Sequence, residues 1–187
     1  MRKLIHSVHI SLDGMIEGPN GEFDWPAMGP ELSAHSFELV ERVDTFLYGR
    51  RVWEMMAGYW PDVESISDDP HDLRFAPVWR STPKVVFSRT LTDPGHGARV
   101  IDGEHLVDEV TALKSEPGKD LVLMGGAEIA GVLTEHGLVD EHDVVVHPVV
   151  LGGGKRLFAG VPDRFDLELV ETRTFDSRAV LLHYRRA

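Results

Sequence analysis

The sequence predicts an α/β protein with a mixed, mostly parallel central sheet. Short apolar segments alternate with segments of helical periodicity through about the first three quarters of the 187 residues. This alternation is typical of parallel sheets covered by helices on both faces. Two further apolar segments near the end flank Asp176-Ser177, which predicts an antiparallel hairpin. The pattern by itself also fits flavodoxin-like and Rossmann folds.

The first elements are a strand, a loop and a helix. Residues 3–12 alternate and then run apolar, so they predict a buried strand that leads into Asp13-Gly14. Residues 14–30 are rich in Gly, Pro and Asn and predict a loop. Residues 31–42 carry their apolar side chains on one stripe, which predicts an amphipathic helix.

The next segment continues the alternation. Residues 45–48 predict a short strand, and residues 50–57 predict a helix directly after it. Residues 58–83 read as irregular and acidic, with a short helix around 71–79. Residues 84–88 predict the following strand.

Three strands and two helices follow in strict alternation. We expect strands over 98–102, 120–124 and 143–151, and helices over 105–114 and 127–137. This arrangement extends the parallel sheet by further strand–helix units.

The end of the chain holds a turn and the closing hairpin. Residues 152–158 form a glycine-rich turn, and strands are expected over 165–175 and 178–185. Neither an internal repeat nor a linker-like segment is present, so residues 1–187 are expected to form a single domain.

Composition excludes several classes of function. The net charge of -12 argues against nucleic acid as the main partner, and the absence of cysteine excludes disulfides and thiolate chemistry. No apolar run approaches the roughly 20 residues that cross a bilayer, and the N-terminus lacks a signal-peptide pattern. With the absence of cysteine, this predicts a cytoplasmic location. The ten histidines show no HExxH or comparable spacing, so no metal site is expected.

A strand–glycine–helix junction occurs twice, at Gly49 and at Gly125-Gly126. A helix N-terminus offers free backbone N–H groups, and glycine lets a phosphate approach them closely. Two such junctions in one sheet could hold both ends of a dinucleotide. The alternative is that each glycine is ordinary turn chemistry.

Arginines follow two of the predicted strands. Arg50 and Arg51 come after Gly49, and Ser88-Arg89 come after the strand over 84–88. Guanidinium groups bind phosphate in bidentate fashion, so these residues would select the 2′-phosphate of NADP. The alternative is surface ion pairing with acids such as Glu54.

The first strand places Ser7, His9, Ser11 and Asp13 on one face. A polar stripe on a buried strand indicates a substrate pocket, with Asp13 as hydrogen-bond acceptor, or as proton donor if burial raises its pKa. Alternatively, Asp13-Gly14 is a turn and His9 is a hydrogen-bonded core residue.

Five segments together resemble a known family. They are SVHISLDGMIEGPNGEFDW, LYGRRVWE, VVFSRTL, LVLMGGAEIAGVL and HPVVLGGGKRLF, which span about residues 5–158. They resemble the dihydrofolate-reductase-like superfamily, and within it the RibD C-terminal reductase domain of riboflavin biosynthesis and its stand-alone relatives. The resemblance implies the three-layer dihydrofolate-reductase-like fold and a homodimer.

The resemblance also implies a site. The cofactor-binding residues would be Gly49, Arg50, Arg51, Val52, Ser88, Arg89, Gly125, Gly126, Ala127 and Glu128. The substrate would lie over the first strand, near Ser11, Asp13, Trp25 and the loop from Gly152 to Arg156, with Gly152, Gly153 and Gly154 as its binding residues. From its place on the polar stripe, Asp13 is expected to be the catalytic residue.

The expected function is NADPH-dependent reduction of a small polar heterocycle, of the 5-amino-6-(5-phosphoribosylamino)uracil reductase type. Dihydrofolate reduction is one alternative. A non-catalytic nucleotide-binding module is another, because fold does not determine function.

Overall fold

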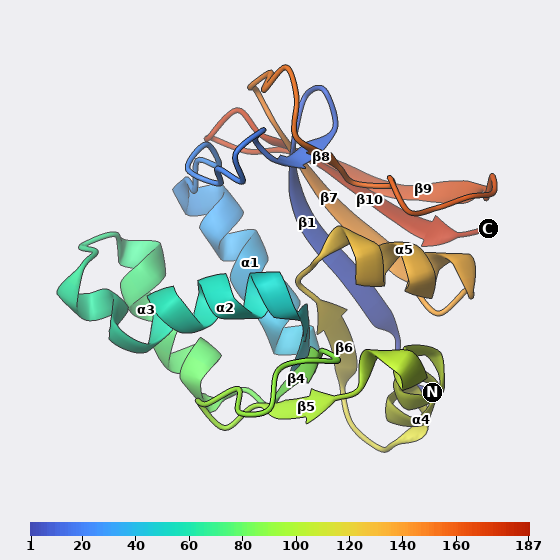
Figure 1. Ribbon diagram of the computed structural model, residues 1–187. Coiled ribbons are helices and arrows are strands. Elements are labelled where there is room, and N and C mark those ends of the chain that lie inside the picture. The colour runs from blue at the N-terminus through green and yellow to red at the C-terminus, as the bar shows by residue number, and fades with distance from the viewer.

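The computed structural model describes residues 1–187. Its centre is an eight-stranded sheet in the order β5-β4-β3-β6-β1-β7-β10-β9 (Figure 1). The strands are β1 (Leu4–Ser11), β3 (Val43–Gly49), β4 (Lys84–Phe87), β5 (Arg99–Ile101), β6 (Asp120–Leu123), β7 (Glu141–His147), β9 (Leu167–Thr174) and β10 (Val180–Arg186). The strands from β5 to β7 in this order pair in parallel, whereas β10 pairs antiparallel with β7 and β9. The predicted mixed sheet and C-terminal hairpin are confirmed.

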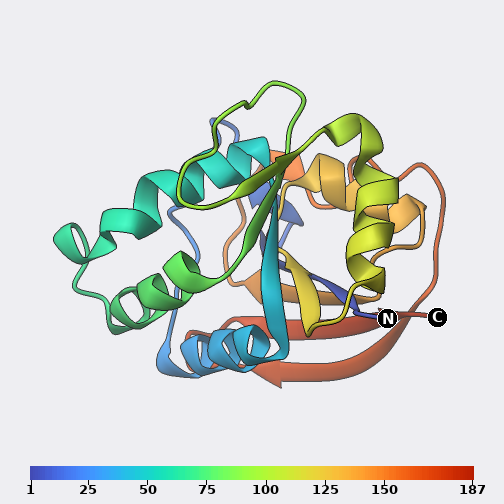
Figure 2. The ribbon, with the colours of Figure 1, turned by 90° about the horizontal axis from the view of Figure 1, so that it is seen from below.

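Helices cover both faces of the sheet (Figure 2). They are α1 (Pro30–Arg42), α2 (Arg50–Tyr59) and α3 (Pro70–Ser81) on one face, and α4 (Leu106–Ser115) and α5 (Ala127–Glu135) on the other. Neighbouring residues of β3 enter different cores: Phe46 belongs to the cluster that contains Trp53 of α2, and Leu47 belongs to the cluster that contains Leu133 of α5. A strand buried on both faces explains why this segment is continuously apolar.

The region predicted as irregular is more helical than expected. A 3₁₀ segment (Trp60–Ser65) and the full helix α3 occupy it. Asp69 caps α3 by accepting a hydrogen bond from the His71 backbone N–H at 2.8 Å, and Phe75 and Trp79 are buried four residues apart. The acidic residues around Asp69 and the internal Pro77 concealed this pattern in the sequence.

A second difference is a small two-stranded sheet made of β2 (Met15–Glu17) and β8 (Lys155–Arg156). Both strands lie within segments predicted as loop and turn. Gly154 has φ +126°, and a Cβ there would lie 2.0 Å from the Glu17 carbonyl oxygen. Glycine is therefore required for this approach, and the glycine-rich turn serves to bring Lys155 against β2.

The strand predicted over 143–151 is shorter, because β7 ends at His147. Pro148 follows it and cannot donate a ladder hydrogen bond. The backbone N–H groups of Leu151 and Gly152 donate to the Asp13 carboxylate.

No helix has the length and apolar composition of a membrane span.

Candidate cofactor and substrate site

The two strand–glycine–helix junctions meet at the carboxyl edge of the sheet. The Gly49 backbone N–H donates to the Gly125 carbonyl oxygen at 2.8 Å, because β3 and β6 are neighbours in the sheet. Helix α2 begins at Arg50 and helix α5 begins at Ala127, so both N-termini open side by side. The predicted proximity of Gly49 and Gly125 is confirmed.

Both helix openings lack a side-chain cap. Gly49 and Gly126 occupy the N-cap positions, and neither helix has a capping hydrogen bond from a side chain. A Cβ at Gly49 would lie 3.1 Å from Ile129 Cδ1 and 3.3 Å from the Gly126 nitrogen. Glycine at position 49 therefore relieves a tight approach between the two helix openings, whose N-terminal N–H groups and positive dipole ends form a cradle that fits phosphate.

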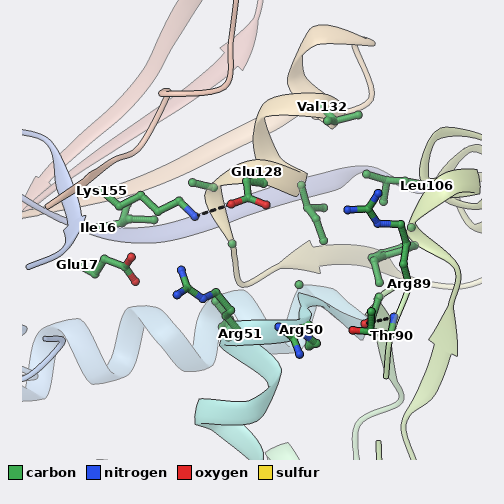
Figure 3. Close-up of a pocket in the computed structure, with 18 residues that line it drawn as sticks. Ile16, Glu17, Arg50, Arg51, Arg89, Thr90, Leu106, Glu128, Val132 and Lys155 are labelled. Atoms are coloured by element: carbon green, nitrogen blue, oxygen red, sulfur yellow. Dashed lines mark hydrogen bonds and ion pairs between the residues drawn. The ribbon is translucent and has the colours of Figure 1, made fainter. Parts of the chain in front are cut away.

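A cleft of about 490 Å³ lies over these openings (Figure 3). All predicted cofactor residues except Gly125 line it; the lining also includes Ile16, Glu17, Phe87, Thr90, Gly103, Leu106, Ile129, Val132 and Lys155. Gly125 lines an adjoining cavity with Gly126. The structure thus brings the whole predicted cofactor set together.

The arginines of the cleft differ in their pairing. Arg50 lies 3.6 Å from Glu54 along α2, so the surface ion pair considered for this residue is present. Arg51 and Arg89 form no ion pair and extend into the cleft from different elements (Figure 3). Unpaired guanidinium groups in a protein of charge -12 are suited to bind an anionic ligand.

Two further contacts shape the rim. Lys155 Nζ lies 3.1 Å from Glu128 Oε1; this contact lowers the pKa of Glu128, and the charges of Arg51 and Arg89 contribute. Ser88 Oγ accepts hydrogen bonds from the backbone N–H groups of Thr90 and Leu91 at 3.2 and 3.0 Å. Ser88 therefore fixes the turn that presents Arg89.

A second cavity of about 280 Å³ adjoins the cleft and shares Ile16, Glu17, Arg51, Val52 and Gly126 with it. Its walls are mainly aromatic and methionine side chains: Phe23, Met28, Met55, Met56, Trp60, Phe75 and Met124. A few polar groups interrupt them, namely Ser7, His9, Ser36 and His71. Apolar walls with a few polar groups are typical of a pocket for a small ring compound.

The structure contradicts a proton-donor role for Asp13. Its carboxylate is exposed, accepts hydrogen bonds from Ser11 Oγ at 2.7 Å and from the Gly152 N–H at 2.9 Å, and lines neither cavity. These hydrogen bonds, with that from the Leu151 N–H, lower the pKa of Asp13 to about 2. Asp13 is therefore ionised at neutral pH and anchors the turn after β7.

The other binding residues predicted for the substrate, Ser11, Trp25, Gly152, Gly153 and Gly154, lie outside both cavities, whereas Lys155 of the same glycine-rich loop lines the cleft. Ser11 is fully buried, and its Oγ bonds to Asp13 and to the Met15 backbone N–H. Trp25 packs edge-on against His147, with ring centroids 5.6 Å apart. Gly152, Gly153 and Gly154 belong to the turn that positions β8.

Several cavity residues were missed by reasoning from sequence. Glu17, Phe23 and Met28 come from the segment predicted only as a loop, and Trp60 and His71 come from the segment predicted as mostly irregular. The stripe Ser7-x-His9 was the one available signal, and both residues do line the cavity.

The fold is of the α/β type, and its paired glycine junctions form an arrangement that fits a phosphate-containing ligand. The profile of the RibD C-terminal domain matches residues 2–181, and the chain belongs to this family. The uncharacterized protein YyaP of Bacillus subtilis (strain 168) is 40% identical over 186 residues, which are 98% of this chain and 94% of YyaP.

Solved structures share the fold. A diaminohydroxyphosphoribosylaminopyrimidine deaminase/5-amino-6-(5-phosphoribosylamino)uracil reductase from Thermotoga maritima superposes with a TM-score of 0.70 at 15% identity, over 100% of this chain and 57% of that protein. Dihydrofolate reductase from Enterococcus faecalis, complexed with NADP(H), gives a TM-score of 0.67 at 16% identity, over 98% and 96% of the two chains. The predicted dihydrofolate-reductase-like fold and the resemblance to the riboflavin-type branch are confirmed.

Proposed function

We propose that this protein is an NADPH-dependent reductase of a small polar heterocycle, of the 5-amino-6-(5-phosphoribosylamino)uracil reductase type. One observation carries the proposal: two uncapped helix openings meet at Gly49 and Gly125, beside two unpaired arginines. The family and the name of the Thermotoga maritima protein support this activity, and the dihydrofolate reductase structure supports NADP(H) as the cofactor.

The residues of the cleft suit a phosphorylated dinucleotide. The N–H groups at the start of α2 and α5 would bind the linking phosphates, and Arg51 and Arg89 would bind the 2′-phosphate that distinguishes NADPH from NADH. When bound, NADPH supplies the hydride. The protein's own part is to orient the two ligands where the cleft and the cavity meet, near Val52 and Gly126.

The adjoining cavity suits the ring of the substrate. Met124 and Phe75 provide apolar walls that exclude water, while the half-buried carboxylate of Glu17 stands at the junction of the two cavities. A carboxylate there can accept hydrogen bonds from amino groups of an aminopyrimidine. Glu17 thus takes the acceptor role that the sequence assigned to Asp13.

We also propose a homodimer formed through the sheet edge. Strand β9 is the edge strand, and its Leu169 and Val170 are 52% and 53% exposed. Apolar side chains on an exposed edge strand favour pairing with another chain. Light scattering after gel filtration should give twice the 20.9 kDa chain mass, and a Val170→Lys variant should shift the mass toward the monomer.

Turnover assays test the reaction. NADPH absorbance should decrease when the enzyme is mixed with 5-amino-6-(5-phosphoribosylamino)uracil. It should remain stable when the enzyme is mixed with dihydrofolate. Turnover of dihydrofolate alone would replace the proposed substrate with the alternative one. NADPH binding without turnover of either compound would favour the non-catalytic module.

A further inference from the structure

Two histidines form a pair that connects the substrate cavity with the loop after β2. His9 of β1 and His147 of β7 lie on neighbouring parallel strands, and His9 Nδ1 is 2.7 Å from His147 Nε2. Their rings are stacked, with centroids 5.0 Å apart and an interplanar angle of 25°. His147 is 1% exposed, whereas His9 lines the cavity.

The direction of this hydrogen bond follows from a third group. The Ala27 backbone N–H lies 3.4 Å from His147 Nδ1. A backbone N–H can only donate, so His147 Nδ1 is the acceptor and carries no proton. A neutral imidazole has one N–H, which in His147 must then be at Nε2, and this group donates to His9 Nδ1.

The same reasoning fixes His9. Because its Nδ1 accepts from His147, the proton of the neutral His9 ring is at Nε2. Burial, together with the neighbouring His147, lowers the pKa of His9 to about 3, and burial lowers the pKa of His147, so both rings are neutral at physiological pH. His9 Nε2 has no hydrogen-bond partner within the protein. The atom is not fully buried, so a ligand in the cavity can reach it.

The pair is held in place by packing. Trp25 meets His147 edge-on at 5.6 Å with an interplanar angle of 77°, and Phe23 meets Trp25 at 5.4 Å. These aromatic contacts on the His147 ring therefore also position the loop that carries Ala27, whose backbone N–H bonds to the same ring. This gives Trp25 a supporting role in place of the direct substrate contact expected from the sequence.

We propose that the Ala27–His147–His9 chain fixes His9 as a neutral hydrogen-bond donor, so that the cavity binds ring compounds that present an acceptor, a carbonyl oxygen or an unprotonated ring nitrogen, to His9 Nε2. The proposal rests on the proposed function in one respect, because it defines the substrate class of the same cavity. It assigns His9 a binding role and requires no proton transfer.

His71 also lines the cavity, but its hydrogen bond does not determine which ring nitrogen carries the proton. His71 Nδ1 lies 2.8 Å from Ser33 Oγ. A hydroxyl group can donate or accept, so the proton of His71 can occupy either ring nitrogen. His9 differs from His71 because its hydrogen-bond chain begins at the Ala27 backbone N–H, which can only donate.

The first test measures the protonated nitrogen directly. A long-range ¹H–¹⁵N spectrum of the wild-type protein at neutral pH should show the proton of His9 at Nε2. In His147→Phe, which keeps an aromatic ring but has no nitrogen, the Nδ1–H form of His9 should become populated. A wild-type His9 protonated at Nδ1, or at both nitrogens, would overturn the proposal.

The second test measures recognition with two probes of the same ring frame, 1-indanone and indane. Only 1-indanone carries an acceptor. The wild type should prefer 1-indanone by about fivefold, which corresponds to one ordinary hydrogen bond. His9→Leu should abolish the preference, His9→Gln should retain part of it because an amide N–H also donates, and equal preference in wild type and His9→Leu would refute the proposal.

NADPH binding serves as the folding control for each variant, since neither histidine lines the phosphate cleft. Neither test requires turnover. A failure of the proposed reductase activity would leave both results unchanged, whereas a failure of the His9 proposal would leave NADPH binding intact.

Discussion

The cleft over the two helix openings, proposed to bind the phosphates, and the adjoining cavity, proposed to bind the substrate, share a border but are built in different ways. The cleft includes the backbone at Gly49 and Gly126, where two helices begin, and the unpaired guanidinium groups of Arg51 and Arg89. The cavity is formed by side chains from β1, the loop after β2, α1, α2, the 3₁₀ segment and α3. The cleft can therefore be read from short sequence segments, whereas the cavity exists only after the helices pack together.

Because the cleft and the cavity are built from different groups, they should recognise different kinds of ligand. Backbone N–H groups and arginines select charge and shape, which suits a ligand common to many reactions. Apolar walls with a few oriented polar groups select one ring system. Variants in the two regions should therefore have separable effects on cofactor and substrate binding.

The largest effect should come from removing both free arginines. Arg51→Ala combined with Arg89→Ala should weaken NADPH binding by about 100-fold or more, because each hydrogen bond to a charged group contributes about 1.5–3 kcal/mol. NADH binding should change little. Fluorescence titration with both nucleotides measures this.

Arg50→Ala is the matched control, because Arg50 lines the same cleft but is paired with Glu54. It should change the NADPH dissociation constant by no more than about threefold, as expected for an exposed pair. Equal losses of NADPH affinity in Arg50→Ala and Arg51→Ala would mean that the absence of an ion pair does not identify the arginine that binds the cofactor.

Gly49→Ala should produce the next largest effect. The added Cβ lies 3.3 Å from the Gly126 nitrogen and 3.1 Å from Ile129 Cδ1, so the Gly126 backbone and the Ile129 side chain must shift by a few tenths of an ångström. We expect about tenfold weaker NADPH binding and a loss of about 1–3 kcal/mol in unfolding free energy. In the control Gly160→Ala the new Cβ meets no atom within 4 Å and position 160 lies outside the cleft, so both quantities should stay near wild type.

Phe23→Ala probes the cavity alone. Phe23 is 40% exposed and lines the cavity but not the cleft. Its removal should raise KM for the heterocyclic substrate by about fivefold through a lost aromatic contact, with the NADPH dissociation constant unchanged. A parallel change in NADPH binding would show that the two regions are not separable.

Asp13→Asn should have the smallest effect on catalysis. A lost proton donor would lower kcat by about 10²–10⁴-fold, whereas we expect a change within about twofold because Asp13 lines neither cavity. Its effect should be on stability. The pKa of the folded state is lowered to about 2, so the carboxylate stabilises the wild type above pH about 4, and this advantage disappears as pH falls toward 2.

Denaturation of wild type and Asp13→Asn at several pH values measures this difference. The two unfolding free energies should differ most near neutral pH and converge under acid. A difference that grows as pH falls would contradict the ionised state of Asp13.

Much of the fold was predictable from the sequence because its signals are local. Residues 45–48 are apolar on both faces and could only be a buried strand, and Asp176-Ser177 marked the hairpin. The same locality revealed Gly49, Gly125, Arg51 and Arg89. These features depend on a few consecutive residues and the known properties of parallel strands.

The remainder depended on contacts between distant segments. The polar stripe on the first strand predicts a catalytic Asp13. Its actual partners, the N–H groups of Leu151 and Gly152, are 138 and 139 residues away and have no sequence signature. Trp25 was expected to meet the substrate but packs on His147 instead. Side-chain direction at such positions is set by tertiary packing.

The central claim is that two helix openings and two free arginines bind one phosphorylated dinucleotide. Parallel titration of the wild type with NADPH and NADH tests it most directly. NADPH should bind at least about 100-fold more tightly, as expected for a 2′-phosphate held by two guanidinium groups. Equal affinity for the two nucleotides, or no binding of either, would contradict the claim.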